Sequence, residues 1–124
     1  ILPKIRQVDR LMRPALQQRV YEAHPELAFY ALAGQPLRTR KKVVAGREER
    51  LQALEQATAP LMVNIRQAVA QALQRYPRRQ VAPDDLLDAY ALVHTAWRIL
   101  HRQACCLPDP APCDACGLRM EIWY

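Results

Sequence analysis

The sequence predicts one helix-rich α/β domain that spans residues 1–124. Apolar residues make up 51% of the chain, which is enough for a packed core. Most of the chain repeats apolar residues at the three-and-four spacing of a helix face, and only two short segments have the composition of strands. Two short strands cannot form a stable sheet alone. We therefore expect the C-terminal part of a larger α/β domain, whose central strands are missing or supplied by a partner chain.

The first half of the chain predicts two helices separated by a short strand. A helix is expected over residues 3–18, kinked or divided at Pro14, because proline removes a backbone donor. Residues 19–23 contain a β-branched and an aromatic residue, which favours a strand. A second helix is expected over residues 26–33, because a proline precedes it and Gly34 can terminate it.

After a loop over residues 35–46, two helices are expected at residues 47–57 and 60–76. The second of them presents a clean apolar stripe opposite polar residues, and Pro77 ends it. These signals predict an amphipathic helix over residues 60–76.

Pro83 begins the longest predicted helix, which extends to about residue 102. Because this helix is apolar nearly all round, we expect it to be buried on more than one side. A Pro/Cys-rich loop follows over residues 107–117, and residues 119–124 form the second strand candidate.

The net charge of +6, from 18 basic and 12 acidic residues, suits a polyanionic partner such as nucleic acid. Ordinary solubility explains the same surplus, and charge alone does not separate the two. No apolar run approaches the roughly 20 residues that span a bilayer, so we expect no membrane association. All four cysteines lie between Cys105 and Cys116, which does not suit a disulfide framework and predicts a reduced, cytoplasmic protein.

Two acids on the last predicted helix are candidate metal ligands. Asp85 and Asp88 are three residues apart, so their carboxylates project side by side. Hard ions such as Mg²⁺ or Mn²⁺ bind carboxylate oxygens and tolerate adjacent carboxylates. Asp88 lies beyond the first turn, among apolar neighbours, where an acid without a partner is costly. The alternative is that Asp84 and Asp85 only begin the helix and that Asp88 is solvated. We favour this alternative for Asp84 and a functional role for Asp88.

Glu22 and His24 follow the first strand candidate, at the place where open α/β sheets carry their sites. Strand alternation places both on one face, where they can bind metal or transfer a proton. The alternative is a turn in which His24 caps or packs against the next helix. From spacing alone the alternative is favoured.

A basic run is the candidate for contact with the phosphate backbone. Six of the 18 cations lie between residues 38 and 50, and no aromatic residue interleaves them to stack on bases. Glu48 and Glu49 are expected to pair with these cations along the helix. A solvated basic face is the alternative. The run consists of Arg38, Arg40, Lys41, Lys42, Arg47 and Arg50.

The cysteine cluster has partial metal-ligand spacing. Cys113 and Cys116 are separated by two residues, as in zinc sites, but adjacent Cys105 and Cys106 cannot easily both bind one tetrahedral ion. We favour free thiols over a structural zinc site. His94, Trp97 and His101 share helical spacing and are interpreted as packing residues.

Several blocks resemble an uncharacterised prokaryotic family of predicted RNase H-like nucleases. They include residues 20–29, with the motif VYEAHPELAF, residues 84–89, with DDLLDA, and residues 117–122, with GLRMEI. Lys41, Lys42 and Arg47 fit the same order. The D-x-x-D-A of Asp85, Asp88 and Ala89 is also similar to the last helix of Holliday-junction resolvases.

The resemblance implies a ribonuclease-H-like mixed sheet flanked by helices, and a two-metal site for phosphodiester hydrolysis. It implies Asp85 and Asp88 as metal ligands and Glu22 and His24 as groups that line the site. It also implies Lys41, Lys42 and Arg47 as phosphate contacts. The opening segment of the family, with its first-strand aspartate, has no counterpart in this chain.

The leading hypothesis is therefore a metal-dependent nuclease that uses Mg²⁺ or Mn²⁺, with a site that is incomplete in this chain. The catalytic candidates are Asp88, Asp85, Glu22 and His24. The alternative is a non-catalytic module of the same fold that binds nucleic acid or protein. A third and weaker hypothesis is a small zinc-stabilised helical interaction domain.

Overall fold

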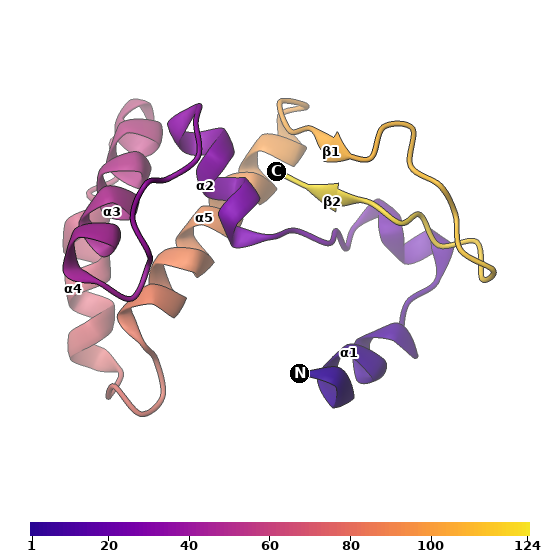
Figure 1. Cartoon of the computed structure of the whole chain (residues 1–124), viewed down its shortest axis with the longest axis horizontal. Coiled ribbons are helices and arrows are strands. Elements are labelled where there is room, and N and C mark those ends of the chain that lie inside the picture. Colours follow the sequence, from indigo (N-terminus) through magenta and orange to yellow (C-terminus); the bar gives the residue numbers. More distant parts are fainter.

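The computed structural model describes all 124 residues, and it contains five α-helices, two 3₁₀ turns and two short strands (Figure 1). The helices are α1 (Leu2–Asp9), α2 (Pro25–Ala33), α3 (Val44–Thr58), α4 (Ile65–Arg75) and α5 (Pro83–Leu100). The 3₁₀ turns are η1 (Pro14–Gln18) and η2 (Ala59–Leu61), and the strands are β1 (Cys106–Leu107) and β2 (Ile122–Trp123).

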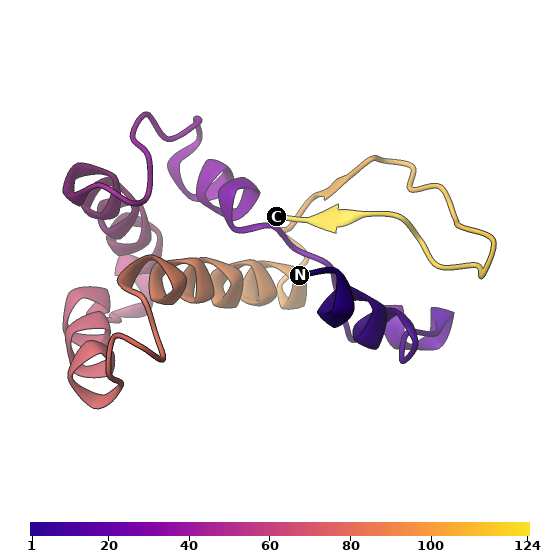
Figure 2. The same cartoon turned by 60° about the horizontal axis from the view of Figure 1, so that its bottom comes forward.

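Helices α2 to α5 pack together and form what we call the helical half of the molecule (Figure 2). Its core consists of two apolar residues from each helix, and the side chains of Phe29 and Leu54 are the largest that are fully buried. The eight core residues are Ala28, Phe29, Ala53, Leu54, Ile65, Val69, Leu87 and Ala91. This core holds α2, α3 and α5 in fixed positions around the loop that connects α2 to α3.

Turn η2 lies between α3 and α4 in the helical half, while α1, η1, β1 and β2 form a second half that contributes no residue to the hydrophobic core (Figure 1). Strands β1 and β2 are antiparallel, and Ala23 extends this sheet through a parallel bridge to Trp123. Gln17 and Arg119 join the two ends of the chain, because the side-chain amide of Gln17 both donates to and accepts from the backbone of Arg119 at 2.9 Å. The second half is thus held mainly by hydrogen bonds.

The predicted class, helix-rich with a small sheet, is confirmed. Helix α2 has the predicted limits, with Pro25 in its first turn and Gly34 after its last residue at a left-handed φ of 68°. Helix α5 begins at Pro83 as expected. Proline and glycine therefore marked these boundaries correctly, because each suits a backbone geometry that other residues adopt less easily.

Several predicted boundaries were wrong. Helix α3 begins at Val44, inside the loop that was expected to extend to residue 46. The first helix ends at Asp9, and Pro14 begins a 3₁₀ turn. The strand expected at residues 19–23 contributes one bridge, at Ala23, and the loop expected from Leu107 instead begins inside β1.

The helix expected from residue 60 begins at Ile65, because Met62 has a left-handed φ of 55°. The side chain of Asn64 then caps α4 by accepting the N–H of Gln67 at 3.0 Å. Asn64 was expected on the polar face of a longer helix, and it is instead the residue that starts a shorter one.

The expected burial of α5 on more than one side was also wrong. Its buried residues, Leu87, Ala91 and Thr95, lie along one stripe, and they are spaced four residues apart. Val93 and Leu100 are 65% and 78% exposed. The structure therefore leaves part of the apolar surface of α5 without a partner.

Candidate functional site

The α2–α3 loop, residues 34–43, brings several of the predicted site residues together. It connects two helices of the core and lies beside α5, because Lys41 reaches Asp88 of that helix. A cavity of about 620 Å³ lies against it and is lined by the loop and by Glu26 and Arg50. The loop is held by an ion pair at Lys41, by Arg50, by Glu49 and by a close approach at Gly46.

Asp88 lies beneath this loop in an ion pair with Lys41. The Lys41 Nζ is 2.7 Å from Asp88 Oδ2, and the side chain of Asp88 is only 13% exposed. The hydrogen bond to Asp88 raises the pKa of Lys41, while burial opposes the shift. Asp88 Oδ1 is buried and has no hydrogen-bond partner. The carboxylate therefore has one oxygen with unused capacity to accept a donor or bind a cation.

Arg50 holds the loop from inside the protein. It is 3% exposed, and its Nη2 lies 2.9 Å from both carboxylate oxygens of Glu26. Its Nη1 donates to the backbone carbonyls of Thr39 and Gly46, and its guanidinium lies 5.3 Å from the centre of the Phe29 ring. The expectation that Arg50 contacts phosphate is not met, because its guanidinium is buried and already paired.

Glu49 fixes the loop backbone. Its two carboxylate oxygens accept the N–H groups of Arg38 and Thr39 at 2.8 and 2.9 Å. The hydrogen bond from Arg38, with a further one from Thr39, lowers the pKa of Glu49 below its ordinary value of 4.5. Three anchors thus hold the loop: the Glu49 carboxylate, the Arg50 guanidinium and the Lys41–Asp88 pair.

The Glu49 anchor predicts a response of the loop to acid. Because the folded pKa lies below 4.5, this carboxylate stabilises the loop above that pH and loses its effect as the pH falls through the folded pKa. We expect the amide resonances of Arg38 and Thr39 to shift together with one midpoint below pH 4.5 in an NMR titration. In Glu49→Gln this shared transition should disappear. Independent midpoints for the two amides would contradict the anchor.

Gly46 allows the loop to approach α3 closely. A Cβ at this position would lie 2.0 Å from the carbonyl oxygen of Arg40. The glycine lies inside a helix with an ordinary φ, so close contact and not backbone strain requires it.

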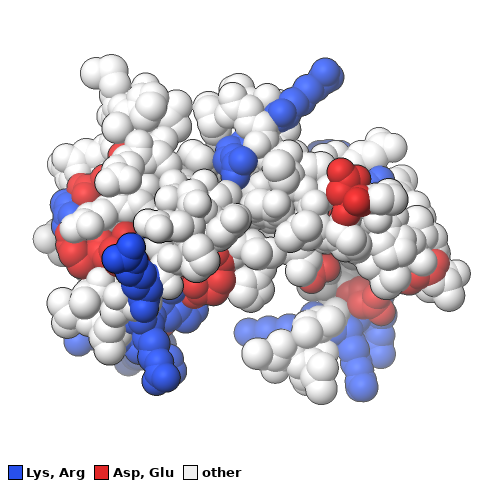
Figure 3. All heavy atoms as spheres, turned by 45° about the horizontal axis from the view of Figure 1, so that its top comes forward, with Lys and Arg blue, Asp and Glu red and all other residues white.

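The cations of the predicted basic run that remain available are Arg38, Arg40, Lys42 and Arg47. The first three are exposed, and none of the four forms an ion pair. On the face drawn in Figure 3, basic side chains gather at separate places beside acidic ones and do not form one continuous patch. The available cations are thus local to the α2–α3 loop and the first turn of α3.

The predicted acids do not converge. Asp85 is exposed one turn before Asp88 on α5, while Glu22 is exposed in the segment before α2. His24 Nδ1 accepts the N–H of Glu26 at 3.3 Å, so His24 caps α2, as the alternative interpretation proposed. No group of three or more His, Cys, Asp or Glu side chains is placed to hold a metal ion.

Two acids that hold the site were not identified from the sequence. Glu26 pairs with Arg50 across 24 residues, and Glu49 binds backbone instead of a neighbouring cation. The expected pairing of Glu48 along its own helix was also wrong, because Glu48 binds Arg66 of α4. No periodic pattern links partners on different helices, so spacing could not have found these pairs.

The cysteines are all free thiols, and burial is the main cause that raises the pKa of Cys106. His94, Trp97 and His101 stack along α5, with ring centres 5.6 and 4.2 Å apart. Their interpretation as packing residues is confirmed, and burial lowers the pKa of His94.

Comparison with known proteins gives one family match. The matching family model covers residues 1–112 and is described as Protein of unknown function (DUF429). No curated protein and no solved structure is significantly similar to the chain. None of the helices combines the length and the apolar character that crossing a membrane requires.

Proposed function

The chain belongs to the DUF429 family, and from the geometry around Asp88 we propose that this member is a metal-dependent nuclease of ribonuclease-H-like fold. In this proposal Asp88 is the acid that binds Mg²⁺ or Mn²⁺, and the α2–α3 loop holds the phosphate backbone of the nucleic acid. The remaining acids of the site are supplied by strands outside this sequence or by a partner chain.

The state of the Asp88 carboxylate carries the proposal. A carboxylate that is 13% exposed, with one oxygen lacking any partner, is costly for stability alone. Hard divalent cations prefer carboxylate oxygens, and Asp85 offers a second carboxylate one turn away. The donor set of this chain therefore fits part of a coordination shell. Such an ion, when bound, neutralises the phosphodiester charge and activates water.

Lys41 has a defined part in this proposal. Its ammonium now neutralises Asp88, so a cation at Oδ1 would compete with it for the same carboxylate. Because Lys41 lies on the loop that carries Arg40 and Lys42, its released charge would add to the phosphate contacts of that loop. Arg47, in the first turn of α3, extends the same basic surface.

A second candidate is a nucleic-acid-binding module of the same fold without hydrolytic activity. The absence of any group of three potential metal ligands favours it. Both candidates use the exposed cations of the α2–α3 loop, and only the first requires Asp88.

Asp88→Asn separates the two candidates. With Mn²⁺ and labelled single-stranded RNA, duplex DNA and RNA–DNA hybrid as probes, we expect the substitution to reduce cleavage by roughly ten- to a hundredfold, because it removes a charged ligand. Asp9→Asn, which changes an exposed acid of α1, is the matched control and should leave the rate unchanged. Equal cleavage by both variants would contradict the nuclease proposal. Salt-sensitive binding without cleavage by any form would support the binding module.

A further inference from the structure

The charged residues that line the cavity beside the α2–α3 loop, which we call the loop cavity, are almost all positive. The only acid among them, Glu26, is paired with Arg50, while Lys41 of the lining is paired with Asp88. The lining cations that have no ion-pair partner are Arg38, Arg40 and Lys42. The loop cavity therefore favours an anion.

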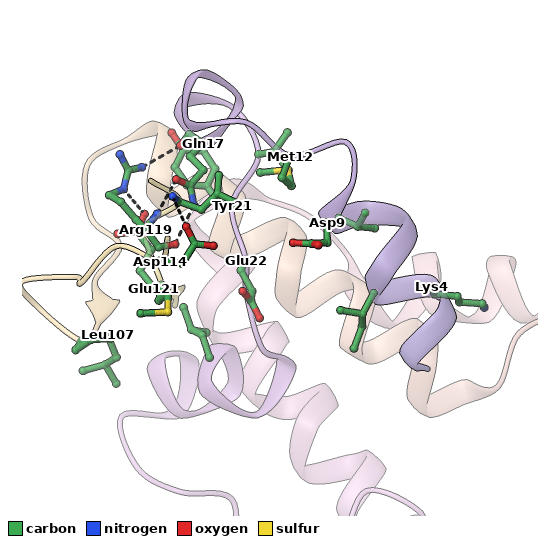
Figure 4. Close-up of a pocket in the computed structure, with 17 residues that line it drawn as sticks. Lys4, Asp9, Met12, Gln17, Tyr21, Glu22, Leu107, Asp114, Arg119 and Glu121 are labelled. Carbon is green, nitrogen blue, oxygen red and sulfur yellow. Dashed lines mark hydrogen bonds and ion pairs between the residues drawn. The ribbon is translucent and has the colours of Figure 1, made fainter. Parts of the chain in front are cut away.

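The larger cavity of about 730 Å³, between α1 and the C-terminal strands, has no such preference. Figure 4 shows Lys4 and Asp9 on its α1 side, with Glu22 and Glu121 on the opposite side. Lys4, Asp9 and Glu22 have no ion-pair partner, so both signs of charge line this cavity. A cluster of unpaired charge of one sign is thus a property of the loop cavity and not of every cavity in the molecule.

Backbone N–H groups at the loop cavity are also free to donate. Those of Arg40, Lys41 and Lys42 donate to no backbone or side-chain acceptor of the chain. Val43, which lines the cavity, begins α3 without a side-chain cap, and the first N–H of that helix to find a carbonyl is that of Arg47. Free N–H groups at a helix N-terminus carry partial positive charge and bind phosphate oxygens.

Arg50 gives an independent indication of an acceptor from outside the chain. Its Nη1 and Nη2 are engaged, but its Nε is buried and has no hydrogen-bond partner. A buried donor without an acceptor is costly. Arg50 is 3% exposed and lines the loop cavity, so the cavity is the side from which an acceptor can approach it.

We infer that the loop cavity binds a phosphomonoester dianion, and that on a nucleic acid this ligand is the phosphate at a chain end. The unpaired cations outnumber the single charge of an internal phosphodiester, whereas a monoester carries up to two charges and only one substituent. The inference deepens the proposed function, on which its nucleic-acid part rests. Because Lys41 of the same loop contacts Asp88, a bound chain end lies next to the proposed metal ligand, and cleavage is expected close to that end.

Two small ligands test the preference for a dianion. At about pH 8 methyl phosphate carries close to two negative charges, while dimethyl phosphate carries one. In amide NMR titrations at constant ionic strength, we expect methyl phosphate to shift the resonances of Arg40, Lys41 and Lys42 with a Kd on the order of 1 mM. Dimethyl phosphate should bind at least about fivefold more weakly. Equal affinities, or resonances that do not move, would overturn the inference.

Val43→Asp tests the backbone donors with a readout that damage to the fold cannot imitate. An aspartate at this N-cap position accepts N–H groups of the first turn of α3, so Tm should rise by roughly 3 °C. The same carboxylate competes for the phosphate donors and repels the ligand, so methyl phosphate should bind at least about tenfold more weakly. Unchanged affinity in this variant would contradict the site.

Lys42→Gln tests the side-chain charge, and Lys4→Gln is its matched control. Both lysines are exposed and without an ion-pair partner, but only Lys42 lines the loop cavity. We expect Lys42→Gln to weaken methyl phosphate at least about threefold and Lys4→Gln to leave its affinity unchanged. Equal losses in the two variants would mean that the net charge of the protein attracts the ligand, and the inference would be wrong.

Single-stranded RNA with phosphate or hydroxyl ends separates this inference from the nuclease proposal. In EDTA, which prevents metal-dependent cleavage, a terminal phosphate should tighten binding about tenfold in a competition assay. Equal binding of both RNAs would overturn the assignment to a chain end, even where methyl phosphate binds. If that happens while Mn²⁺-dependent cleavage still requires Asp88, the inference fails and the proposed function stands. If phosphorylated ends bind more tightly but no RNA is cleaved with Mn²⁺, the inference stands and the nuclease proposal fails.

Discussion

Replacing Arg50 by methionine should lower the free energy of unfolding by about 3 kcal/mol, because it removes the buried guanidinium that holds the α2–α3 loop. The substitution leaves Glu26 without its bidentate partner and leaves two backbone carbonyls, those of Thr39 and Gly46, without a side-chain donor. It also removes the guanidinium beside the Phe29 ring. Urea unfolding followed by circular dichroism measures the loss.

Arg47→Met is the matched control for Arg50→Met. Arg47 lies three residues earlier on α3 and forms no ion pair, so its replacement should change stability by no more than about 0.5 kcal/mol. A double variant that also carries Glu26→Ala should lose less than the sum of the two single losses, because both changes break one pair. Equal losses for Arg50→Met and Arg47→Met would show that the buried guanidinium does not hold the loop.

Gly46→Ala should destabilise the protein by about 3 kcal/mol or more, and lower Tm by roughly 12 °C. In an ordinary helix interior the same change is stabilising by up to about 1 kcal/mol. The sign reverses here because the new Cβ would lie 2.0 Å from the carbonyl oxygen of Arg40, so the loop must move away from α3. The displaced loop would also weaken the contact between Lys41 and Asp88.

Gly34→Ala provides a comparison for Gly46→Ala at a position with no steric conflict. Gly34 has a left-handed φ of 68°, and a Cβ added there would have no atom within 4 Å, so only backbone strain of about 1 kcal/mol is expected. Differential scanning calorimetry of both variants checks the order. A higher Tm for Gly46→Ala than for the unmodified protein would mean that the loop does not pack against α3.

The ends of the helices could be predicted where a single proline or glycine determines the backbone conformation. Pro25, Gly34 and Pro83 each favour one geometry, and the structure uses them as the sequence indicated. The start of α4 was missed because Pro60 also suits the 3₁₀ turn that precedes it, while Asn64 is the actual cap. The exposure of Val93 was missed because apolar composition does not reveal whether a partner exists to cover it.

The sequence identified the types of residue in the site, but it did not identify which of them pair with one another. The sequence marked Asp88 as an acid in an apolar setting, and the structure places it nearly buried. Its partner Lys41 is 47 residues away, and only the packing of α2, α3 and α5 brings the two together. Arg50 and Lys42 belong to the same basic run, but Arg50 is buried in α3 and Lys42 is exposed in the loop before it. The place of each residue in the fold, and not its charge, determines its exposure.

The contact between Gln17 and Arg119 has a consequence for the order in which the chain folds. The two residues are 102 positions apart, so joining them in an unfolded chain closes a long loop at a large entropic cost. Once the helical half has formed, the path outside it shortens to about 25 residues, those of 18–24 and 101–118, which reduces that cost by about 1 kcal/mol. The pairing of the two chain ends should therefore form after the helical half, and it should open before that half unfolds.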